Sequence, residues 1–443
     1  MKTLRIILAV LSAVLAVLMA DPVHARQAGS WSPASSLGLA RQEHGAARIG
    51  DEVYVVGGLV IPFSSTNQVE VLDLGTGLWS AAAPLPVAAD HVAVAAVGGK
   101  LYVAGGFGAS FQVFDDLWIY DPATGAWSAG SSLPAGRAAS WAVGHQGKLY
   151  MFGGVGSFGQ VVASTFIYDP ATDQWSQGAD MPTPREHLGA VPVGEFIYVI
   201  GGRVGFTPTP ANERYDPAAD QWEVRAPMPT LRSAAGIAAL GNNVFVAGGE
   251  FPILSSANEV YDVTSDAWGT QAPMPLPRHG VPGVALDDRV LLPAGGVVQG
   301  FFPTADSDTF TPASLLGIPA EVSASGGGVH SLSLHAGAER AGLTYLVLGS
   351  ATGSSPGTAV DGLSLPLNFD VYTEGTLNLV NAPPYAQTFG TLDGAGRAQA
   401  TFTVPAGVSP AHVGLQLHHA YLVFGPLFNA VLASEAVPLT LVP

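Results

Sequence analysis

Residues 148–154 read KLYMFGG, an apolar run that ends on two glycines. The same ending occurs six times at steps of 47 or 48 residues, with the glycine doublets at 57–58, 105–106, 153–154, 201–202, 248–249 and 295–296. Tryptophan recurs at a similar interval, at positions 31, 79, 127, 175, 222 and 268. A period near 50 residues with short β segments predicts a propeller, in which each repeat supplies one blade of four strands.

Each element of the repeat has a physical role. A glycine doublet lets the backbone adopt positive φ or approach a neighbouring blade, because glycine has no Cβ. A pair such as Tyr168-Asp169 closes a strand at a turn, and the ring of Trp175 is expected to cover the outermost strand of its blade. With a recurring Pro-x-x-Arg turn, this pattern resembles the kelch repeat family. The resemblance implies a kelch β-propeller over about two thirds of the chain.

The register of the repeat predicts how the ring closes. Trp31 precedes the first glycine doublet, no tryptophan follows the last, and Phe310 occupies the tyrosine position of the sixth unit. We therefore expect the segment around Trp31 to pair with the strand of Phe310, which leaves no open sheet edge at the junction. The predicted fold is all-β, a six-bladed kelch propeller closed by an N-terminal outer strand.

The N-terminus is typical of an exported protein. Lys2 and Arg5 precede an apolar run from residue 6 to residue 20, and Val23-His24-Ala25 has the small residues of a cleavage site. Residues 1–25 are therefore predicted to be a signal peptide. The mature protein is expected to be extracytoplasmic (secreted, periplasmic or at the cell surface), with no membrane span after cleavage and with the propeller in residues 26–312.

The composition limits the chemistry of the chain. None of its 443 residues is cysteine, which excludes disulfides, thiolate metal sites and cysteine nucleophiles. A net charge of −17 repels phosphate backbones and excludes nucleic acid as a partner. The pair His418-His419 is expected on opposite faces of a strand, and no phosphate-binding glycine loop is present. The sequence therefore predicts no cofactor and no metal site.

The period is lost after Pro312. Residues 313–328 are rich in small residues and are predicted to be an interdomain linker. Residues 329–443 are predicted to form a C-terminal β-sandwich, because strand-like runs alternate with turn signals there. These runs cover residues 329–335, 343–348, 365–372, 398–404, 412–424 and 437–442.

One face of the predicted propeller collects candidate ligand-binding residues. The turns that precede the innermost strands carry Arg41, Arg137, Arg185, Arg232 and Arg278, and the loops after the glycine doublets carry phenylalanines that include Phe206 and Phe251. Guanidinium groups and aromatic walls are suited to a carboxylate-bearing sugar or an acidic peptide. The alternative is that these arginines bond backbone carbonyls within the blades, because they belong to the repeat itself.

Departures from the repeat are not required by the scaffold and are therefore more informative. The residue after the doublet is Arg203 in the fourth unit and Glu250 in the fifth, and the fourth unit also carries Glu186-His187. Neighbouring blades are expected to bring these residues and Arg232 into one sector of the mouth. Such groups are suited to proton transfer beside a bound anion. The alternative is an ion-pair network without catalytic function.

The leading functional interpretation is recognition. An exported ring would bind an extracytoplasmic protein, peptide or glycan through its loop face, with ligand contacts from Arg185, Glu186, Arg203, Arg232, Arg278, Phe206 and Phe251. In a third interpretation the ring is only a structural spacer.

The competing interpretation is an enzyme, a sugar-acid epimerase or mutarotase with Glu250 and His187 as catalytic residues. Gly249-Glu250 resembles the motif of the sialic-acid mutarotases, which are secreted kelch proteins. Their motif continues with an arginine six residues after the glutamate, where this chain has Ser256.

Overall fold

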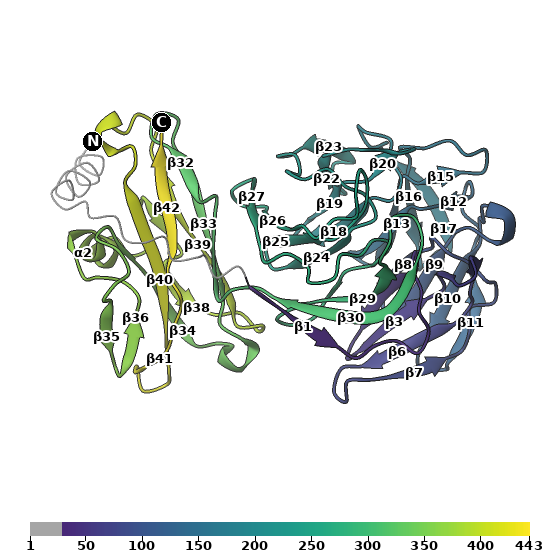
Figure 1. Ribbon diagram of the computed structural model, residues 1–443, viewed down its shortest axis with the longest axis horizontal. Coiled ribbons are helices and arrows are strands. Elements are labelled where there is room, and N and C mark those ends of the chain that lie inside the picture. The colour runs from purple at the N-terminus through teal and green to yellow at the C-terminus, as the bar shows by residue number, and fades with distance from the viewer. Residues whose placement is uncertain (1–28) are drawn as a thin grey trace.

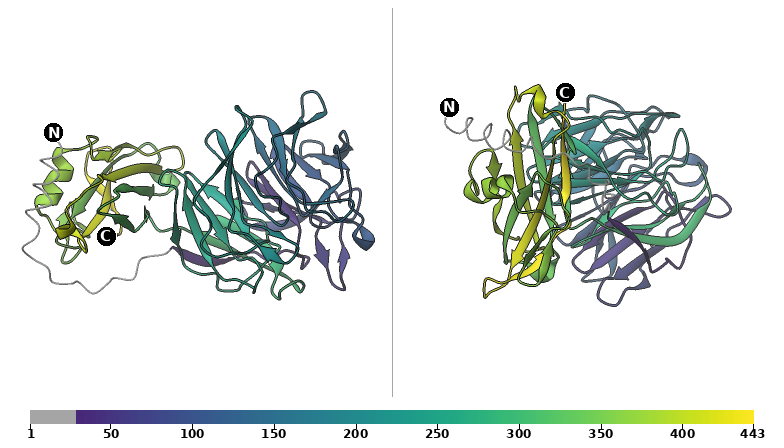
Figure 2. Two further views of the ribbon diagram at one scale, coloured as in Figure 1. Left: turned by 90° about the horizontal axis from the view of Figure 1, so that it is seen from above. Right: turned by 60° about the vertical axis from the view of Figure 1, so that its left-hand side comes forward.

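The computed structural model of the protein describes residues 29–443 (Figure 1). The predicted signal peptide, residues 1–25, lies outside the described residues. Figures 1 and 2 show a ring of sheets and, beside it, a C-terminal body that is also built mainly of strands. Within the described part of the chain, no helix has both the length and the apolar character that crossing a membrane requires.

Residues 30–311 form six four-stranded antiparallel sheets, here called blades 1 to 6. Blade 1 consists of β2 (Gly45–Ile49), β3 (Glu52–Val56), β6 (Val69–Asp73) and β7 (Leu78–Ala82). Blade 2 consists of β8 (Ala93–Val97), β9 (Lys100–Ala104), β10 (Leu117–Asp121) and β11 (Ala126–Ala129). Blade 3 consists of β13 (Trp141–His145), β14 (Lys148–Phe152), β16 (Thr165–Asp169) and β17 (Gln174–Gly178).

Blade 4 consists of β18 (Gly189–Val193), β19 (Phe196–Ile200), β22 (Asn212–Asp216) and β23 (Gln221–Val224). Blade 5 consists of β24 (Gly236–Leu240), β25 (Asn243–Ala247), β26 (Asn258–Asp262) and β27 (Ala267–Thr270). Blade 6 consists of β28 (Val284–Ala285), β29 (Val290–Gly296), β30 (Pro303–Thr311) and β1 (Ser30–Ala34). The loops add β4 (Leu59–Val60), β5 (Ser64–Ser65), η1 (Ala109–Phe111), β12 (Arg137–Ala138), β15 (Val155–Gly156), β20 (Arg203–Val204) and β21 (Thr207–Pro208).

The innermost strands of the six blades form a closed circuit. Strand β2 contacts β8, the contacts continue through β13, β18 and β24 to β28, and β28 contacts β2 again. Small residues make this narrow centre possible. A Cβ on Gly236 of β24, for example, would lie 2.1 Å from a side-chain carbon of Leu292 in blade 6.

The predicted closure by the N-terminal segment is confirmed. Strand β1 pairs with β30 in antiparallel register, and Trp31 lies opposite Phe310 with ring centroids 5.1 Å apart. The indole N–H of Trp31 also donates to the carbonyl of Ala272, which follows blade 5, at 2.8 Å. The first described segment of the chain therefore completes the last blade and joins it to its neighbour.

The glycine doublets are required where blades meet. Gly105 has φ +62°, and a Cβ on it would lie 2.1 Å from the carbonyl oxygen of Arg137 in the next unit. The N–H of Gly106 donates to this same oxygen at 2.7 Å. The corresponding bond of the last doublet runs from Gly295 to Arg41 of the first unit at 2.9 Å. The doublet thus lets one blade's backbone bond directly to the next.

The C-terminal part contains one antiparallel and one mixed sheet. The antiparallel sheet has the order β31 (Leu315–Ile318), β33 (Gly328–His335), β39 (Arg397–Val404) and β37 (Tyr385–Ala386). The mixed sheet has the order β32 (Glu321–Ser323), β42 (Val437–Val442), β40 (Gln416–Phe424), β34 (Thr344–Ser350) and β38 (Phe389–Thr391), and β41 (Ala430–Ala433) pairs with β40. Both sheets contribute to one core, in which Leu332 and Leu334 pack with Val347 and Tyr421.

The remaining C-terminal elements are short. They are a hairpin of β35 (Thr358–Val360) and β36 (Leu363–Leu365), the helix α2 (Val371–Asn378), and the 3₁₀ turns η2 (Ala338–Arg340) and η3 (Pro410–His412).

Two segments of this part differ from the sequence prediction. The predicted strand 365–372 is wrong, because β36 ends at Leu365 and helix α2 begins at Val371. Asp370 starts the helix with a capping box, in which its side chain accepts the N–H of Thr373. The predicted linker 313–328 contains strands β31 and β32, and its buried Leu316 and Ile318 pack against Phe310 of blade 6.

Candidate functional site

The site lies on the propeller axis and is built on six short turns. Each turn directly precedes the innermost strand of its blade, except in blade 6, where β28 starts a few residues later. We call these segments the inner turns; they are residues 41–43, 89–91, 137–139, 185–187, 232–234 and 278–280. The third residue of every inner turn has a positive φ, between 51° and 55°. This left-handed conformation is uncommon for residues other than glycine, and its sixfold recurrence indicates one shared constraint.

That constraint is a closed ring of backbone hydrogen bonds. The third residue of each inner turn donates its N–H to the carbonyl of the third residue of the preceding one. The six bonds run from Glu43 to Gly280, His91 to Glu43, Ala139 to His91, His187 to Ala139, Ala234 to His187 and Gly280 to Ala234, at 2.7–3.0 Å. The ring fixes the positions of six Cα atoms around the axis.

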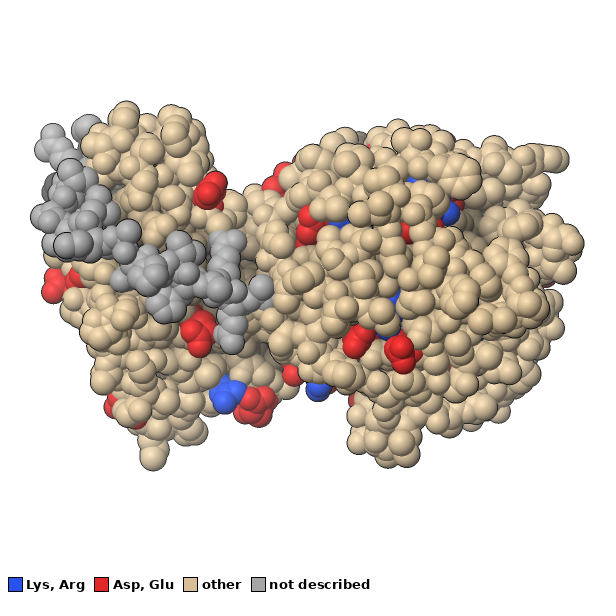
Figure 3. All heavy atoms as spheres, viewed as in Figure 1, with Lys and Arg blue, Asp and Glu red and all other residues tan. Residues whose placement is uncertain are grey.

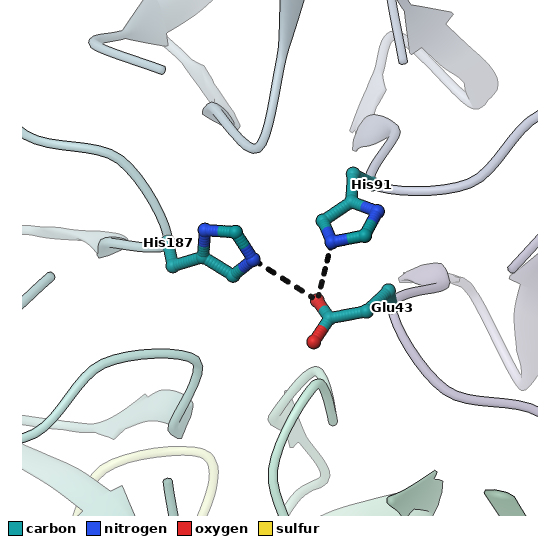
Figure 4. A group of neighbouring side chains, drawn as sticks. All are labelled: Glu43, His91 and His187. Atoms are coloured by element: carbon teal, nitrogen blue, oxygen red, sulfur yellow. Dashed lines mark ion pairs between the residues drawn. The ribbon is translucent and has the colours of Figure 1, made fainter. Parts of the chain in front are cut away.

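Three of these six residues carry polar side chains, and they meet (Figure 4). The Nε2 atoms of His91 and His187 lie 3.6 and 3.8 Å from the same carboxylate oxygen, Oε2 of Glu43. The two imidazole rings are 4.9 Å apart between centroids and nearly perpendicular. All three side chains are about nine-tenths buried, with 7–11% of their side-chain surface exposed.

A second carboxylate stands behind each of these imidazoles. Nδ1 of His91 lies 2.5 Å from Asp90 Oδ1, and Nδ1 of His187 pairs with Glu186 Oε2. The hydroxyl of Ser65 in turn donates to the other oxygen of Asp90 at 2.6 Å. Both rings are therefore held with Nδ1 toward a carboxylate and Nε2 toward the axis.

Arg203 connects the histidine side of the cluster to Glu250. Its Nε donates to Glu186 at 2.9 Å, and its Nη1 donates to Glu250 Oε1 at 2.6 Å. Its Nη2 lies 3.2 Å from Nε2 of His187. Four of the five residues predicted to share one sector, Glu186, His187, Arg203 and Glu250, thus form one hydrogen-bonded network, whereas the fifth, Arg232, bonds within its own blade.

His279 completes the cluster from blade 6. Its Nε2 lies 3.0 Å from the carbonyl oxygen of Val298. Its buried Nδ1 makes no hydrogen bond but faces two carboxylates, Oε1 of Glu43 at 3.3 Å and Oε2 of Glu250 at 3.5 Å. The side chain of His279 is fully buried. Glu43 therefore stands between imidazoles on both of its oxygens.

The electrostatics of the cluster favour an ionised Glu43. Burial by itself raises the pKa of Glu43, but the imidazoles of His91, His279 and His187 outweigh it and hold that pKa well below its usual range. Burial lowers the pKa values of His91 and His279, but the surrounding carboxylates together outweigh it, so both pKa values are raised: Glu43, Asp90 and Glu186 act on His91, and Glu43 and Glu250 act on His279. At the buried axis, the ionised Glu43 thus faces His91 and His279, whose raised pKa values favour their protonated forms.

Arg185, Arg232 and Arg278, which the sequence predicted to contact a ligand, bond within the blades instead. Their side chains are fully buried inside the blades. Arg185 donates to Glu213 Oε2 at 2.5 Å and to the carbonyl of Val199 at 3.0 Å. Arg232 makes the same contacts with Glu259 and Val246. Arg278 bonds Asp308 at 2.6 Å. The alternative that repeat arginines bond within the blades is therefore the correct one.

The two predicted phenylalanines lie together at the edge of the cluster. Phe206 is 80% exposed, and its ring centroid lies 5.5 Å from that of Phe251. The guanidinium of Arg203 stacks on Phe251, with 4.7 Å to the ring centroid. The loops after the doublets thus surround the charged centre with aromatic side chains.

Sequence reasoning missed Glu43, His91 and His279 as site residues. The first position of the inner turns attracted the interpretation instead, because it is a charged arginine in five of the six turns. The signal that could have found them is variation at the third position of the inner turns, which reads Glu43, His91, Ala139, His187, Ala234 and Gly280. His279 occupies the second position of its turn, and comparing the second positions of the six turns in the same way would have found it.

Comparisons with known proteins agree with the fold. Residues 43–249 match the family of the KLHDC2/KLHL20/DRC7 Kelch-repeats domain. One similar solved structure is titled "Structure of YjhT"; the likeness has a TM-score of 0.57 at 21% identity, and it covers 63% of this chain and 97% of that one. No curated protein matches the chain. Within the ring of repeated blades, residues 43–249 are thus a kelch-repeat domain.

Proposed function

We propose that the protein is an extracytoplasmic recognition protein, in which a six-bladed kelch propeller, followed by a β-sandwich, binds a protein, peptide or glycan through its loop face. The proposal rests on exposed aromatic side chains in the loops after the glycine doublets. Five phenylalanines there are at least half exposed, and we call them the aromatic rim: Phe63, Phe111, Phe158, Phe206 and Phe302. The location outside the cytoplasm rests on the signal peptide predicted for residues 1–25.

Three members of the rim, Phe63, Phe111 and Phe302, belong to one group of neighbouring rings that also includes Phe301. Phe63 of blade 1 lies 6.3 Å from Phe111 of blade 2 and 4.8 Å from Phe301 of blade 6, between ring centroids. Phe107, next to Phe111, also packs against His91 of the axial cluster at 5.3 Å. Exposed aromatic side chains that gather on one face are typical of interaction surfaces, where a few of them supply most of the binding free energy.

The epimerase alternative has less support from the geometry. Arg232, one of the arginines whose guanidinium group would suit a substrate carboxylate, is buried in its blade. Both oxygens of Glu250 are already engaged, one by Arg203 and the other by the N–H of Gly300 at 2.8 Å. The cavity next to the cluster at the axis has a volume of about 40 Å³, far below the several hundred Å³ of a typical small-molecule pocket.

Binding of the full chain to peptide and glycan arrays tests the proposal. We expect a ligand whose affinity falls by about tenfold or more in the Phe63→Ala and Phe206→Ala variants, because truncation of a central aromatic contact costs that much. Phe428→Ala is the matched control, since Phe428 is 67% exposed but lies in the C-terminal part. Ligands that respond equally to all three changes, or to none, contradict the rim as the binding surface and leave the spacer interpretation.

A further inference from the structure

The axial cluster has the donor set and the spacing of a metal site. Two imidazole nitrogens and one carboxylate oxygen, from His91, His187 and Glu43, all lie within 4.8 Å of one another (Figure 4). Ligand atoms at about 2 Å from one ion lie about 3–4 Å apart. The distances of 3.6 and 3.8 Å from Glu43 Oε2 to the two Nε2 atoms fall in this range.

The groups behind the imidazoles provide a second, independent observation. A histidine that binds a metal through one nitrogen commonly has its other nitrogen bonded to a carboxylate, which fixes the tautomer and the ring orientation. Asp90 does this for His91, and Glu186 does it for His187. Both carboxylates are themselves held, Asp90 by Ser65 and Glu186 by Arg203. The lone pairs on both Nε2 atoms are thus directed toward the axis.

The backbone beneath these ligands is unusually well fixed. Each of the three residues is a member of the closed ring of six N–H to carbonyl hydrogen bonds. Their Cα atoms therefore need little rearrangement when an ion enters, which favours binding. The cavity of about 40 Å³ that Glu43, His91 and His187 help to line has room for at least one water molecule, which can fill an open coordination position.

We propose that the propeller axis binds one divalent transition-metal ion of the Zn²⁺ type, through Nε2 of His91, Nε2 of His187 and Oε2 of Glu43. Water completes the coordination. Imidazole and carboxylate ligands suit this class of ion, and the chain has no thiolate to offer. The sequence alone predicted no metal site, so the proposal reverses that expectation. It does not depend on the proposed recognition function.

Two neighbours of the site bear on this proposal. Nη2 of Arg203 lies 3.2 Å from Nε2 of His187, so an ion must displace this contact. Arg203 retains its bonds to Glu186 and Glu250 when that happens. On the other side, Nδ1 of His279 lies 3.3 Å from Glu43 Oε1, the carboxylate oxygen that the ion does not use.

Metal titration of the full chain, prepared without a histidine tag and stripped with chelator, tests the proposal. We expect the wild type to bind one Zn²⁺ per chain by calorimetry and to develop visible absorption bands with Co²⁺. Replacement of a ligand in Glu43→Gln or His187→Gln should weaken Zn²⁺ binding by more than about 100-fold, because loss of an outer partner alone costs 10- to 100-fold. Asp90→Asn should weaken Zn²⁺ binding by about 10- to 100-fold, and Ser65→Ala should weaken it less.

Control variants separate loss of the site from loss of the fold. His145→Ala removes an imidazole elsewhere on the propeller, where it contacts the carbonyl of Glu195, and should leave Zn²⁺ affinity unchanged. Glu43→Gln keeps the size of the side chain, and its thermal unfolding is compared with that of the metal-free wild type. Two results overturn the proposal: a wild type that binds no Zn²⁺ or Co²⁺ in stoichiometric amount, or binding that survives in the His91→Ala, His187→Ala double variant.

Discussion

At the scale of single residues, the inner-turn arginines bond to other strands of their own blades. In blade 4 Arg185 pairs with Glu213, and in blade 5 Arg232 pairs with Glu259. Blade 3 has Phe166 at the carboxylate position, and the guanidinium of Arg137 stacks on its ring at 4.8 Å. Blade 2 lacks both charges, because Ala89 and Trp118 fill the same two positions within one apolar cluster. Where the carboxylate is absent, the arginine thus either stacks on an aromatic ring, as in blade 3, or is itself replaced, as in blade 2.

The pairing of Arg185 with Glu213 predicts the effect of removing one partner. Arg185→Ala removes the cationic partner of the buried Glu213 and leaves it with a hydrogen bond from Thr183, which we expect to cost about 3–5 kcal/mol of unfolding free energy. The double variant Arg185→Ala, Glu213→Trp copies the arrangement of blade 2 and should recover part of that loss. Urea denaturation of the three proteins measures both effects. A double variant that is no more stable than the single one contradicts the interpretation.

A second residue-scale prediction concerns pH. Burial, with the nearby Arg397, lowers the pKa of His335 to about 4, although Asp393 opposes this effect. Neither ring nitrogen of His335 makes a hydrogen bond. In the unfolded chain the pKa is near 6.5, so below this pH the unfolded state binds a proton that the folded state does not. Its contribution to stability is thus complete above pH 6.5 and is lost as the pH falls toward 4.

The difference between wild type and His335→Gln isolates this contribution. Between pH 6.5 and 4 the stability of the wild type should fall more steeply than that of the variant, by about 1.4 kcal/mol per pH unit. Chemical denaturation at several pH values provides the measurement, with His145→Gln as a control. Parallel pH profiles for wild type and His335→Gln would mean that His335 does not have the shifted pKa.

At the scale of elements, strand β1 decides whether the ring is closed. It covers the outer edge of β30 over five residue pairs. A chain that begins at Ser36 lacks β1 and exposes that edge, so the amides of β30 that face β1 should exchange hydrogen faster. We also expect a lower melting temperature and more self-association. A chain that begins at Gly29 is the control, and unchanged protection of β30 in the shorter chain contradicts this role.

The success of the sequence prediction differed between elements for a physical reason. The blades repeat, so the glycines and tryptophans that hold them together recur at a fixed interval, and six imperfect copies support one another. Helix α2 occurs once, and its start depends on a local capping box at Asp370 rather than on a period. The inner turns repeat in backbone but not in side chain. The repeat could therefore be recognised from the sequence. The residues at the axis could not, because their side chains do not repeat.

At the scale of the whole molecule, the C-terminal part lies beside the propeller (Figures 1 and 2), and the two parts share buried contacts. Leu316 and Ile318 of β31 pack in one apolar cluster with Phe245 and Phe310 of the propeller. Nearby, Asp262 of blade 5 accepts hydrogen bonds from Ser331 at 3.0 Å and Gln399 at 3.3 Å. The segment predicted as a linker is thus an interface. On the face of the molecule that Figure 3 draws, few Lys, Arg, Asp and Glu side chains are visible.

Ile318→Asp tests the interface, because it places a charge inside that cluster. We expect the two parts to unfold in separate calorimetric transitions and residues 312–328 to become sensitive to protease. Ile253→Asp makes the same change at a loop position that is 70% exposed and should have little effect. A single unaltered transition in Ile318→Asp contradicts the interface.

The hydrogen-bonded circle of inner turns ties the number of repeats to the chemistry at the centre. A duplicated or deleted unit changes the circumference of that circle, and the gaps between the imidazoles and Glu43 widen or narrow with it. Evolution can therefore exchange the three polar side chains for others one at a time, but it cannot lengthen or shorten this gene by one repeat and keep the same centre.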